Sequence, residues 1–145
     1  MIILAVDLGA RRLGFAICDA EERVASPLQM VEVSSPAEAL EAVCHVARET
    51  SATRIVVGEP RRLDGRAGRA SRLAGAFAEK LRSRGFETVL WDERLSSAEA
   101  DSALRLVQMP RKKRSQRLDA IAAQRILASY LEMRRRELAR NQKRE

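Results

Sequence analysis

The alternation of apolar and polar stretches predicts five strands and four helices. The strands are expected at Ile2–Val6, Leu13–Cys18, Val24–Val33, Arg54–Gly58 and Thr88–Trp91, and the helices at about 36–47, 70–81, 96–106 and from 118 to beyond 130. Ser35, Pro36 and Glu38 have the spacing of a helix start, with a serine cap, a first-turn proline and an acid three residues after the cap. Strands that alternate with helices after an opening run of three strands predict a mixed α/β sheet covered by helices.

The first strand ends in a carboxylate. Asp7 follows Ile2–Val6 directly, and Gly9 and Gly14 bracket a turn into the returning strand, so the stretch predicts a hairpin with an acid at its mouth. Asp7 either caps that turn or holds a metal ion or faces a phosphate. These residues alone leave both interpretations open.

Further acids stand at the ends of later elements. Glu59 follows the strand Arg54–Gly58, and Asp92 and Glu93 follow the strand that ends at Trp91. Because side chains alternate across a sheet, only one of Asp92 and Glu93 can share a face with Asp7. Asp119 opens the apolar stripe of the last helix, where a carboxylate needs a charge or hydrogen-bond partner.

Such a set of carboxylates favours a divalent cation. Three carboxylates within a few ångströms repel one another unless a cation lies between them. Mg²⁺ prefers hard oxygen ligands and accepts phosphate oxygens beside protein carboxylates. With two ions about 4 Å apart, one would activate a water molecule and the other would stabilise the departing oxygen of a phosphodiester. No protein nucleophile would then be required.

The net charge of +7 is concentrated near the C-terminus. Residues 110–145 hold twelve Lys and Arg against four acids, whereas the first 109 residues have a net charge of −1. A basic block beside a nearly neutral body indicates a polyanionic partner, with nucleic acid favoured over a membrane surface. Backbone contacts are expected from Arg11, Arg12, Arg61, Arg62, Arg66, Arg94, Arg111, Lys112, Lys113 and Arg114. Residues 140–145 are expected to be a solubilising tail.

Length and composition set the class of protein. A chain of 145 residues with 46% hydrophobic residues is expected to form one globular domain. No apolar run approaches the roughly 20 residues that span a bilayer, and the first strand lacks the basic leader of a signal peptide. Cys18 and Cys44 are expected to be free thiols in a reducing cytoplasm. The only histidine, His45, is expected to be structural or exposed.

Four motifs in this order resemble the YqgF/RuvX family of RNase H-like proteins, known as Holliday junction resolvases and as nucleases that mature the 5′ end of pre-16S rRNA. The motifs are Asp7-Leu8-Gly9-Ala10-Arg11-Arg12-Leu13-Gly14, Val56-Val57-Gly58-Glu59-Pro60 with Leu63-Asp64-Gly65, Trp91-Asp92-Glu93-Arg94-Leu95-Ser96-Ser97, and Arg111-Lys112-Lys113-Arg114 with Asp119, Ala122 and Ala123. Together they cover essentially the whole chain.

The resemblance implies a fold and a site. The fold would be an RNase H-like mixed five-stranded sheet with helices on both faces, formed by residues 1–138 and followed by a basic tail at 139–145. Asp7, Glu93 and Asp119 would be the acidic triad, with Mg²⁺ or Mn²⁺ as the ion, which selects Glu93 over Asp92. Two residues depart from the family pattern. Glu59 replaces a leucine, so it either joins the metal site or pairs with nearby arginines. Ala10 replaces a hydroxyl residue.

The expected function is a metal-dependent endonuclease in the cytoplasm, a monomer or weak homodimer, that processes the 5′ end of pre-16S rRNA. A Holliday junction resolvase acting on branched DNA is an alternative of the same class. A second alternative is a non-catalytic nucleic-acid-binding or ribosome-assembly protein. An actin-like ATPase or sugar kinase is disfavoured, because one domain cannot form the cleft between domains that holds the nucleotide.

Overall fold

The computed structural model describes residues 1–60, 66, 68–95 and 111–144, with side chains from residue 120 onward in the last helix. The elements are β1 (Ile3–Leu8), β2 (Arg12–Cys18), β3 (Ala25–Glu32), α1 (Pro36–Glu49), β4 (Arg54–Glu59), α2 (Arg69–Ser83), β5 (Glu87–Asp92), a 3₁₀ turn η1 (Glu93–Leu95) and α4 (Arg111–Arg144). The five predicted strands are therefore confirmed.

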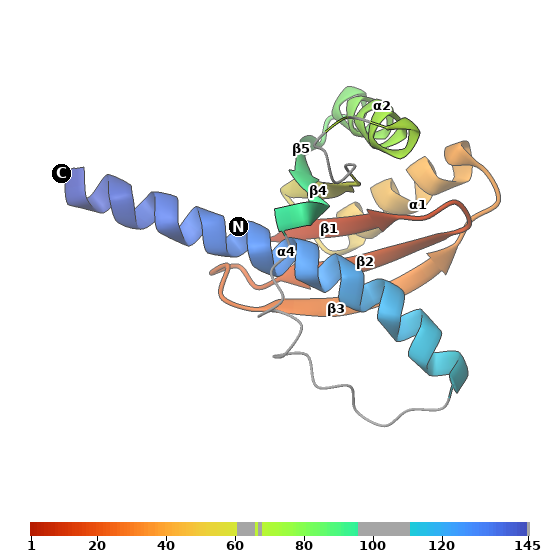
Figure 1. Ribbon diagram of the computed structural model, residues 1–145, viewed down its shortest axis with the longest axis horizontal. Helices are drawn as coiled ribbons and strands as arrows, with labels where there is room; N and C mark the ends of the chain where they lie inside the picture. Colours follow the sequence, from red (N-terminus) through yellow and green to blue (C-terminus); the bar gives the residue numbers. More distant parts are fainter. Residues whose placement is uncertain (61–65, 67, 96–110, 145) are drawn as a thin grey trace.

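The strands form one mixed sheet in the order β3-β2-β1-β4-β5 (Figure 1). The pairs β1–β2 and β2–β3 are antiparallel, whereas β1–β4 and β4–β5 are parallel. In the parallel part Val6 lies beside Val57, and Gly58 lies beside Trp91. The carboxyl ends of β1, β4 and β5 therefore meet at one edge of the sheet.

Helices cover both faces of the sheet, as the resemblance implied. Side chains of α1 and α2 pack against Val6 and Val57 in one buried cluster. On the other face α4 packs against Ala5 and Val56, and Ile126 is among its buried residues. Consecutive residues of β1 and β4, such as Ala5 and Val6, thus belong to clusters on opposite faces of the sheet. Alternation along these strands therefore tells which face each side chain is on.

Local sequence explains where α1 begins. The Ser35 hydroxyl accepts a hydrogen bond from the backbone N–H of Glu38 at 3.1 Å, and Pro36 is the first helical residue. The Glu38 carboxylate accepts a bond from the Ser34 backbone N–H at 3.2 Å. The predicted cap is confirmed. The bond to the Glu38 carboxylate comes from Ser34, which is one residue before the capping serine.

The last helix is longer than the sequence pattern predicted. This helix was expected to begin at about residue 118, but α4 runs from Arg111 to Arg144. The predicted start is wrong because it required apolar periodicity, whereas Lys, Arg and Gln are themselves good helix formers. The helix expected at 96–106 lies outside the described residues.

Cys18 and Cys44 are free and buried. His45 is exposed and lies 3.2 Å from the Glu49 carboxylate, one helical turn away. None of the helices in the described part of the chain has a stretch long and apolar enough to cross a bilayer.

Candidate active site

The carboxyl ends of the parallel strands bring two acids together. Asp7 lies near the end of β1, and Glu93 follows β5 as the first residue of η1. Ala5 and Val56 pack against α4, so alternation places Asp7 and Gly58 on that same face. The two acids thus approach each other over the strand between them, β4.

Glu93 occupies space that a side chain at position 58 would fill. A Cβ built on Gly58 would lie 2.7 Å from Glu93 Oε1 and 2.6 Å from Ile126 Cδ1. Contacts this short do not occur at real Cβ atoms, so the Glu93 carboxyl rests against the bare backbone of β4, next to α4. The sequence pattern indicated Gly58 only as a strand end, because Glu93 and Ile126 are distant from it in sequence.

The environment of Glu93 disfavours its charge. Burial, the neighbouring charge of Asp7, a hydrogen bond with Asp7 and the charge of Asp92 together raise the pKa of Glu93 to about 7, and burial has the largest effect. At neutral pH the two carboxyls therefore hold a fraction of a proton between them. A pair of like groups in this state is a favourable place for a cation.

Asp92 has a different partner. Trp91 packs beside α4 and donates a hydrogen bond to Ser129 at 2.7 Å, so the next residue, Asp92, lies on the other face. The Asp92 carboxylate accepts bonds from Arg94 Nη2 at 2.7 Å and from its backbone N–H at 2.9 Å. Alternation left Asp92 and Glu93 open, and the structure brings Glu93 to Asp7.

The structure describes the side chain of Glu59, but for Asp119 it describes only the helical backbone. Glu59 lies two residues after Val57, which packs under α1 and α2, so alternation places it on the face opposite Asp7. Asp119 belongs to α4, but its side chain lies outside the described ones. Its position is one turn before Ala123, which packs against the sheet. Among the described side chains no group of three His, Cys, Asp or Glu could hold a metal ion.

The predicted phosphate contacts are only partly described. Arg11, Arg12 and Arg66 are exposed, the first two at the β1–β2 turn. The guanidinium of Arg94 is held by Asp92. Arg61 and Arg62 lie outside the described residues, and for Arg111, Lys112, Lys113 and Arg114 the structure describes only the helical backbone.

Comparison with known proteins identifies the family. The sequence profile of the family described as "RuvX: Holliday junction resolvase" matches residues 1–133. The chain belongs to the RuvX family. It is 42% identical over 135 residues to a protein of Anaeromyxobacter sp. (strain K), covering 92% of this chain and 98% of that one. A protein of Chloroflexus aurantiacus (strain J-10-fl) is 36% identical, with 92% and 88% covered. Both relatives carry the name "Putative pre-16S rRNA nuclease".

Solved structures support the same fold. RuvC of Thermus thermophilus superposes with a TM-score of 0.60 at 16% identity, covering 92% of this chain and 96% of that one. The RuvC complex with a Holliday junction substrate gives a TM-score of 0.58 at 15% identity and the same coverage. The RuvX chain thus has the fold of RuvC-like, RNase H-type resolvases, and its family is one of nucleases that hydrolyse nucleic-acid ester bonds.

Proposed function

We propose that this RuvX protein is a metal-dependent endonuclease that cuts structured RNA, and that its substrate is the 5′ end of pre-16S rRNA. The observation that carries the proposal is the pairing of Asp7 with Glu93 at the carboxyl edge of the sheet, where burial and the second carboxyl raise the pKa of Glu93 to about 7. The names of the relatives support the choice of substrate.

The donor set fits a hard divalent cation. Asp7 and Glu93 supply carboxylate oxygens within hydrogen-bond reach of each other, which is the ligand type that Mg²⁺ and Mn²⁺ select. Asp119, one turn before the packed residue Ala123, is proposed as the third ligand. A bound pair of divalent ions would activate water and stabilise the departing oxygen of a phosphodiester. Glu59, on the opposite face, is left out of this ligand set.

The chain's own residues position the substrate. The hydrogen bond between Asp7 and Glu93 fixes the two carboxyls relative to each other, and Gly58 leaves the space in which Glu93 lies. Arg11 and Arg12 are exposed at the β1–β2 turn, near the same edge, where they can contact phosphates. Such contacts position a backbone without reading its sequence, which suits a substrate recognised by shape.

The test compares two substrates and one substitution. Purified protein is incubated with a ribosomal RNA precursor and with a four-way DNA junction, each with Mg²⁺, Mn²⁺ or a chelator. Cleavage of the precursor is expected with either ion and not with the chelator. Asp7→Asn should abolish cleavage while leaving salt-sensitive binding intact or tighter, because it removes one negative charge from the site.

Three other outcomes of this test would change or contradict the proposed function. Cleavage of the DNA junction alone would replace the proposed substrate by branched DNA, which the description of the family favours. Binding of either nucleic acid without cleavage under any ion would contradict the nuclease proposal and favour a binding or assembly protein. Cleavage that survives Asp7→Asn would move the site elsewhere in the chain.

A further inference from the structure

The last helix extends well beyond the sheet. Leu131 is 2% exposed, whereas every residue from Arg135 to Arg144 is exposed. At about 1.5 Å per residue, the thirteen residues from Leu131 to Arg144 span roughly 20 Å. Figure 1 shows this end of α4 projecting past the strands. The projection therefore carries its charge on a helix.

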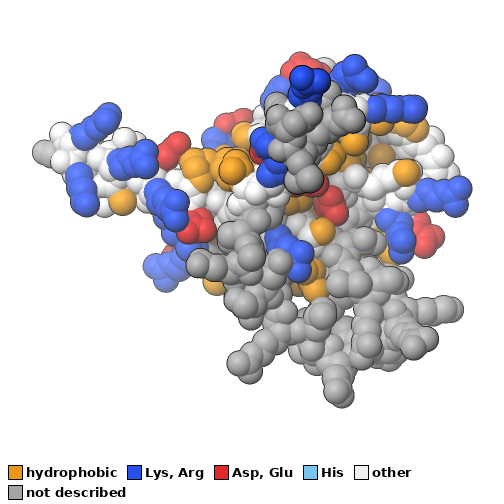
Figure 2. Space-filling model, in the orientation of Figure 1, with side chains coloured by type: hydrophobic (Ala, Val, Ile, Leu, Met, Phe, Trp, Pro, Cys, Tyr) orange, Lys and Arg blue, Asp and Glu red, His pale blue; other side chains and the backbone are white. Residues whose placement is uncertain are grey.

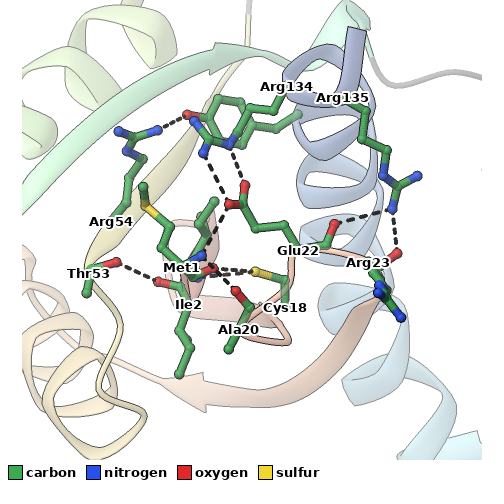
Figure 3. Close-up of polar contacts among 12 residues, drawn as sticks. Met1, Ile2, Cys18, Ala20, Glu22, Arg23, Thr53, Arg54, Arg134 and Arg135 are labelled. Atoms are coloured by element: carbon green, nitrogen blue, oxygen red, sulfur yellow. Dashed lines mark hydrogen bonds and ion pairs between the residues drawn. The ribbon is translucent and has the colours of Figure 1, made fainter. Parts of the chain in front are cut away.

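Two arginines anchor the base of the projection. Arg134 donates hydrogen bonds to the Glu22 carboxylate through Nε and, at 3.2 Å, through Nη2 (Figure 3). Arg135 Nη2 donates to the backbone carbonyls of Arg23 and, at 3.3 Å, of Glu22. The turn between β2 and β3 thereby fixes the direction in which α4 leaves the sheet, and these two cations are already engaged.

Beyond this anchor four cations share one side of the helix. At 100° per residue, Arg136, Arg140, Lys143 and Arg144 lie within an arc of about 100°. The centre of that arc is about a third of a turn from the side that packs on the sheet. We call these four residues the arm stripe. Figure 2 shows Lys and Arg side chains gathered on this projecting end.

Most of the arm stripe has no internal counter-charge. Arg136 contacts Glu132 at 2.8 Å, but both side chains are more than half exposed, so this pair contributes little stability. Within the described part of the chain no carboxylate pairs with Arg140, Lys143 or Arg144. Three exposed cations within two helical turns repel one another, and a polyanion relieves that repulsion.

The chemistry of the stripe favours phosphate over protein. The stripe itself contains no apolar or aromatic side chain, and the exposed Leu138 lies on another side of the helix. Protein interfaces need an apolar core, with aromatic residues enriched and charged ones depleted. Contacts between Arg or Lys and a nucleic-acid backbone need neither.

We propose that the arm stripe is a second contact for the phosphate backbone of structured RNA, remote from the Asp7–Glu93 pair. The identity of the ligand rests on the proposed function. Position 140 lies 21 residues after position 119 in α4, which is about 32 Å along the helix. A ligand that touches both the stripe and the part of the site at position 119 must therefore be about 32 Å long or more, which is about eleven base pairs of an A-form RNA duplex at ~2.8 Å per pair.

The test separates the arm stripe from net charge. The arm variant is Arg140→Gln, Lys143→Gln and Arg144→Gln, in which glutamine keeps a good helix propensity. The matched control is Arg69→Gln, Arg72→Gln and Lys80→Gln on α2, which covers the other face of the sheet. These three control residues are also exposed, and both variants lose three positive charges. Thermal melting and circular dichroism establish that both fold.

Binding is measured in chelator, so that cleavage plays no part. The probe is a 24-base-pair RNA duplex, titrated with salt and compared with an 8-base-pair duplex. The arm variant is expected to bind the long duplex about tenfold more weakly, and the slope of log K against log salt should decrease in magnitude by about 2. The α2 variant should change both quantities far less, and the loss in the arm variant should be smaller on the short duplex.

Three outcomes would overturn the proposal. Equal losses in the two variants would show an effect of net charge alone, and an unchanged arm variant would remove the contact altogether. Loss of binding to an acidic polypeptide with RNA binding intact would assign the stripe to a protein partner. Failure of the nuclease proposal is distinguishable, because it is decided by cleavage in Asp7→Asn and this binding assay is not.

Discussion

Two partly buried acids, one at each edge of the sheet, have pKa values shifted in opposite directions. At the edge where β1 begins, Glu22 accepts hydrogen bonds from Arg134 and, at 3.2 Å, from the Met1 ammonium (Figure 3). The bond from Arg134 lowers the pKa of Glu22 against the effect of burial. At the edge where β1 ends, burial and Asp7 raise the pKa of Glu93 to about 7.

The difference separates an acid that stabilises the fold from one that costs stability. Near Glu22 the chain supplies the cations itself, and the Arg54 guanidinium nearby is likewise shared between Glu87 at 2.6 Å and the Tyr130 hydroxyl at 2.9 Å. Every cause that shifts the pKa of Glu93 acts against its charge. Such strain is expected where a site is arranged for an external cation.

The largest expected effect is a difference in cleavage rate between two variants, one with a substitution at each edge. Glu93→Gln should reduce Mg²⁺-dependent cleavage by roughly 10²–10³-fold, because it removes one of the proposed charged ligands. Glu22→Gln should leave cleavage within about threefold but lower the free energy of unfolding by about 1–2 kcal/mol through the weakened bond to Arg134. Initial rates and denaturant melts measure the two quantities. Comparable losses of activity in both variants would break the distinction between the edges.

The next effect concerns the space that Glu93 occupies. Gly58→Ala would force Glu93 or Ile126 to move, and cleavage should decrease by roughly 10–100-fold with a loss of about 1–3 kcal/mol in unfolding free energy. The half-saturating Mg²⁺ concentration should rise, since Glu93 no longer lies in place beside Asp7. Titration of cleavage with Mg²⁺ and thermal melting provide the measurements.

Two further variants control this prediction. At Gly75, in α2, the nearest atom to a built Cβ is Leu90 Cδ1 at 3.9 Å, so Gly75→Ala should raise stability by up to about 1 kcal/mol without changing cleavage. Adding Ile126→Val to Gly58→Ala removes one of the two collisions. That double variant should regain stability more than activity. Full activity in Gly58→Ala alone would show that the carboxyl position is not critical.

The sequence pattern predicted the elements that bring the acids together. Apolar runs such as Ile2–Val6 are typical of buried strands, and alternation correctly separated Asp92 from Glu93. It could not choose between them, because the choice depends on which face α4 covers, and that is decided by contacts such as Trp91 with Ser129.

Two features could not be predicted from the pattern of apolar residues: the role of Gly58 and the start of α4. The role of Gly58 requires Glu93 and Ile126, which are distant in sequence, so no local signal carries it. The start of α4 at Arg111 was missed because a basic run has helix propensity but no apolar stripe. The arm stripe was missed for the same reason, because its spacing has meaning only once residues 136–144 are known to be helical.

The smallest expected effect is a pH dependence that has opposite signs at the two edges. Glu93 has a folded-state pKa of about 7 against an ordinary value of 4.5, so between these values the folded state binds more protons than the unfolded state. In chelator, the contribution of Glu93 to stability therefore falls as pH rises from 5 to 8. We expect about 1–2 kcal/mol, after allowance for solvent screening of a half-buried group.

Denaturant melts from pH 4 to pH 8 test this sign. Glu93→Gln should flatten the fall between pH 5 and pH 8, and Mg²⁺ should reverse it, because a cation that binds only the folded state favours the ionised pair. Glu22, whose pKa is lowered, contributes stability that is present above pH 4.5 and lost as the pH falls below it. A profile in chelator that rises from pH 5 to pH 8 and is unaffected by Glu93→Gln would mean that Asp7 and Glu93 do not strain each other.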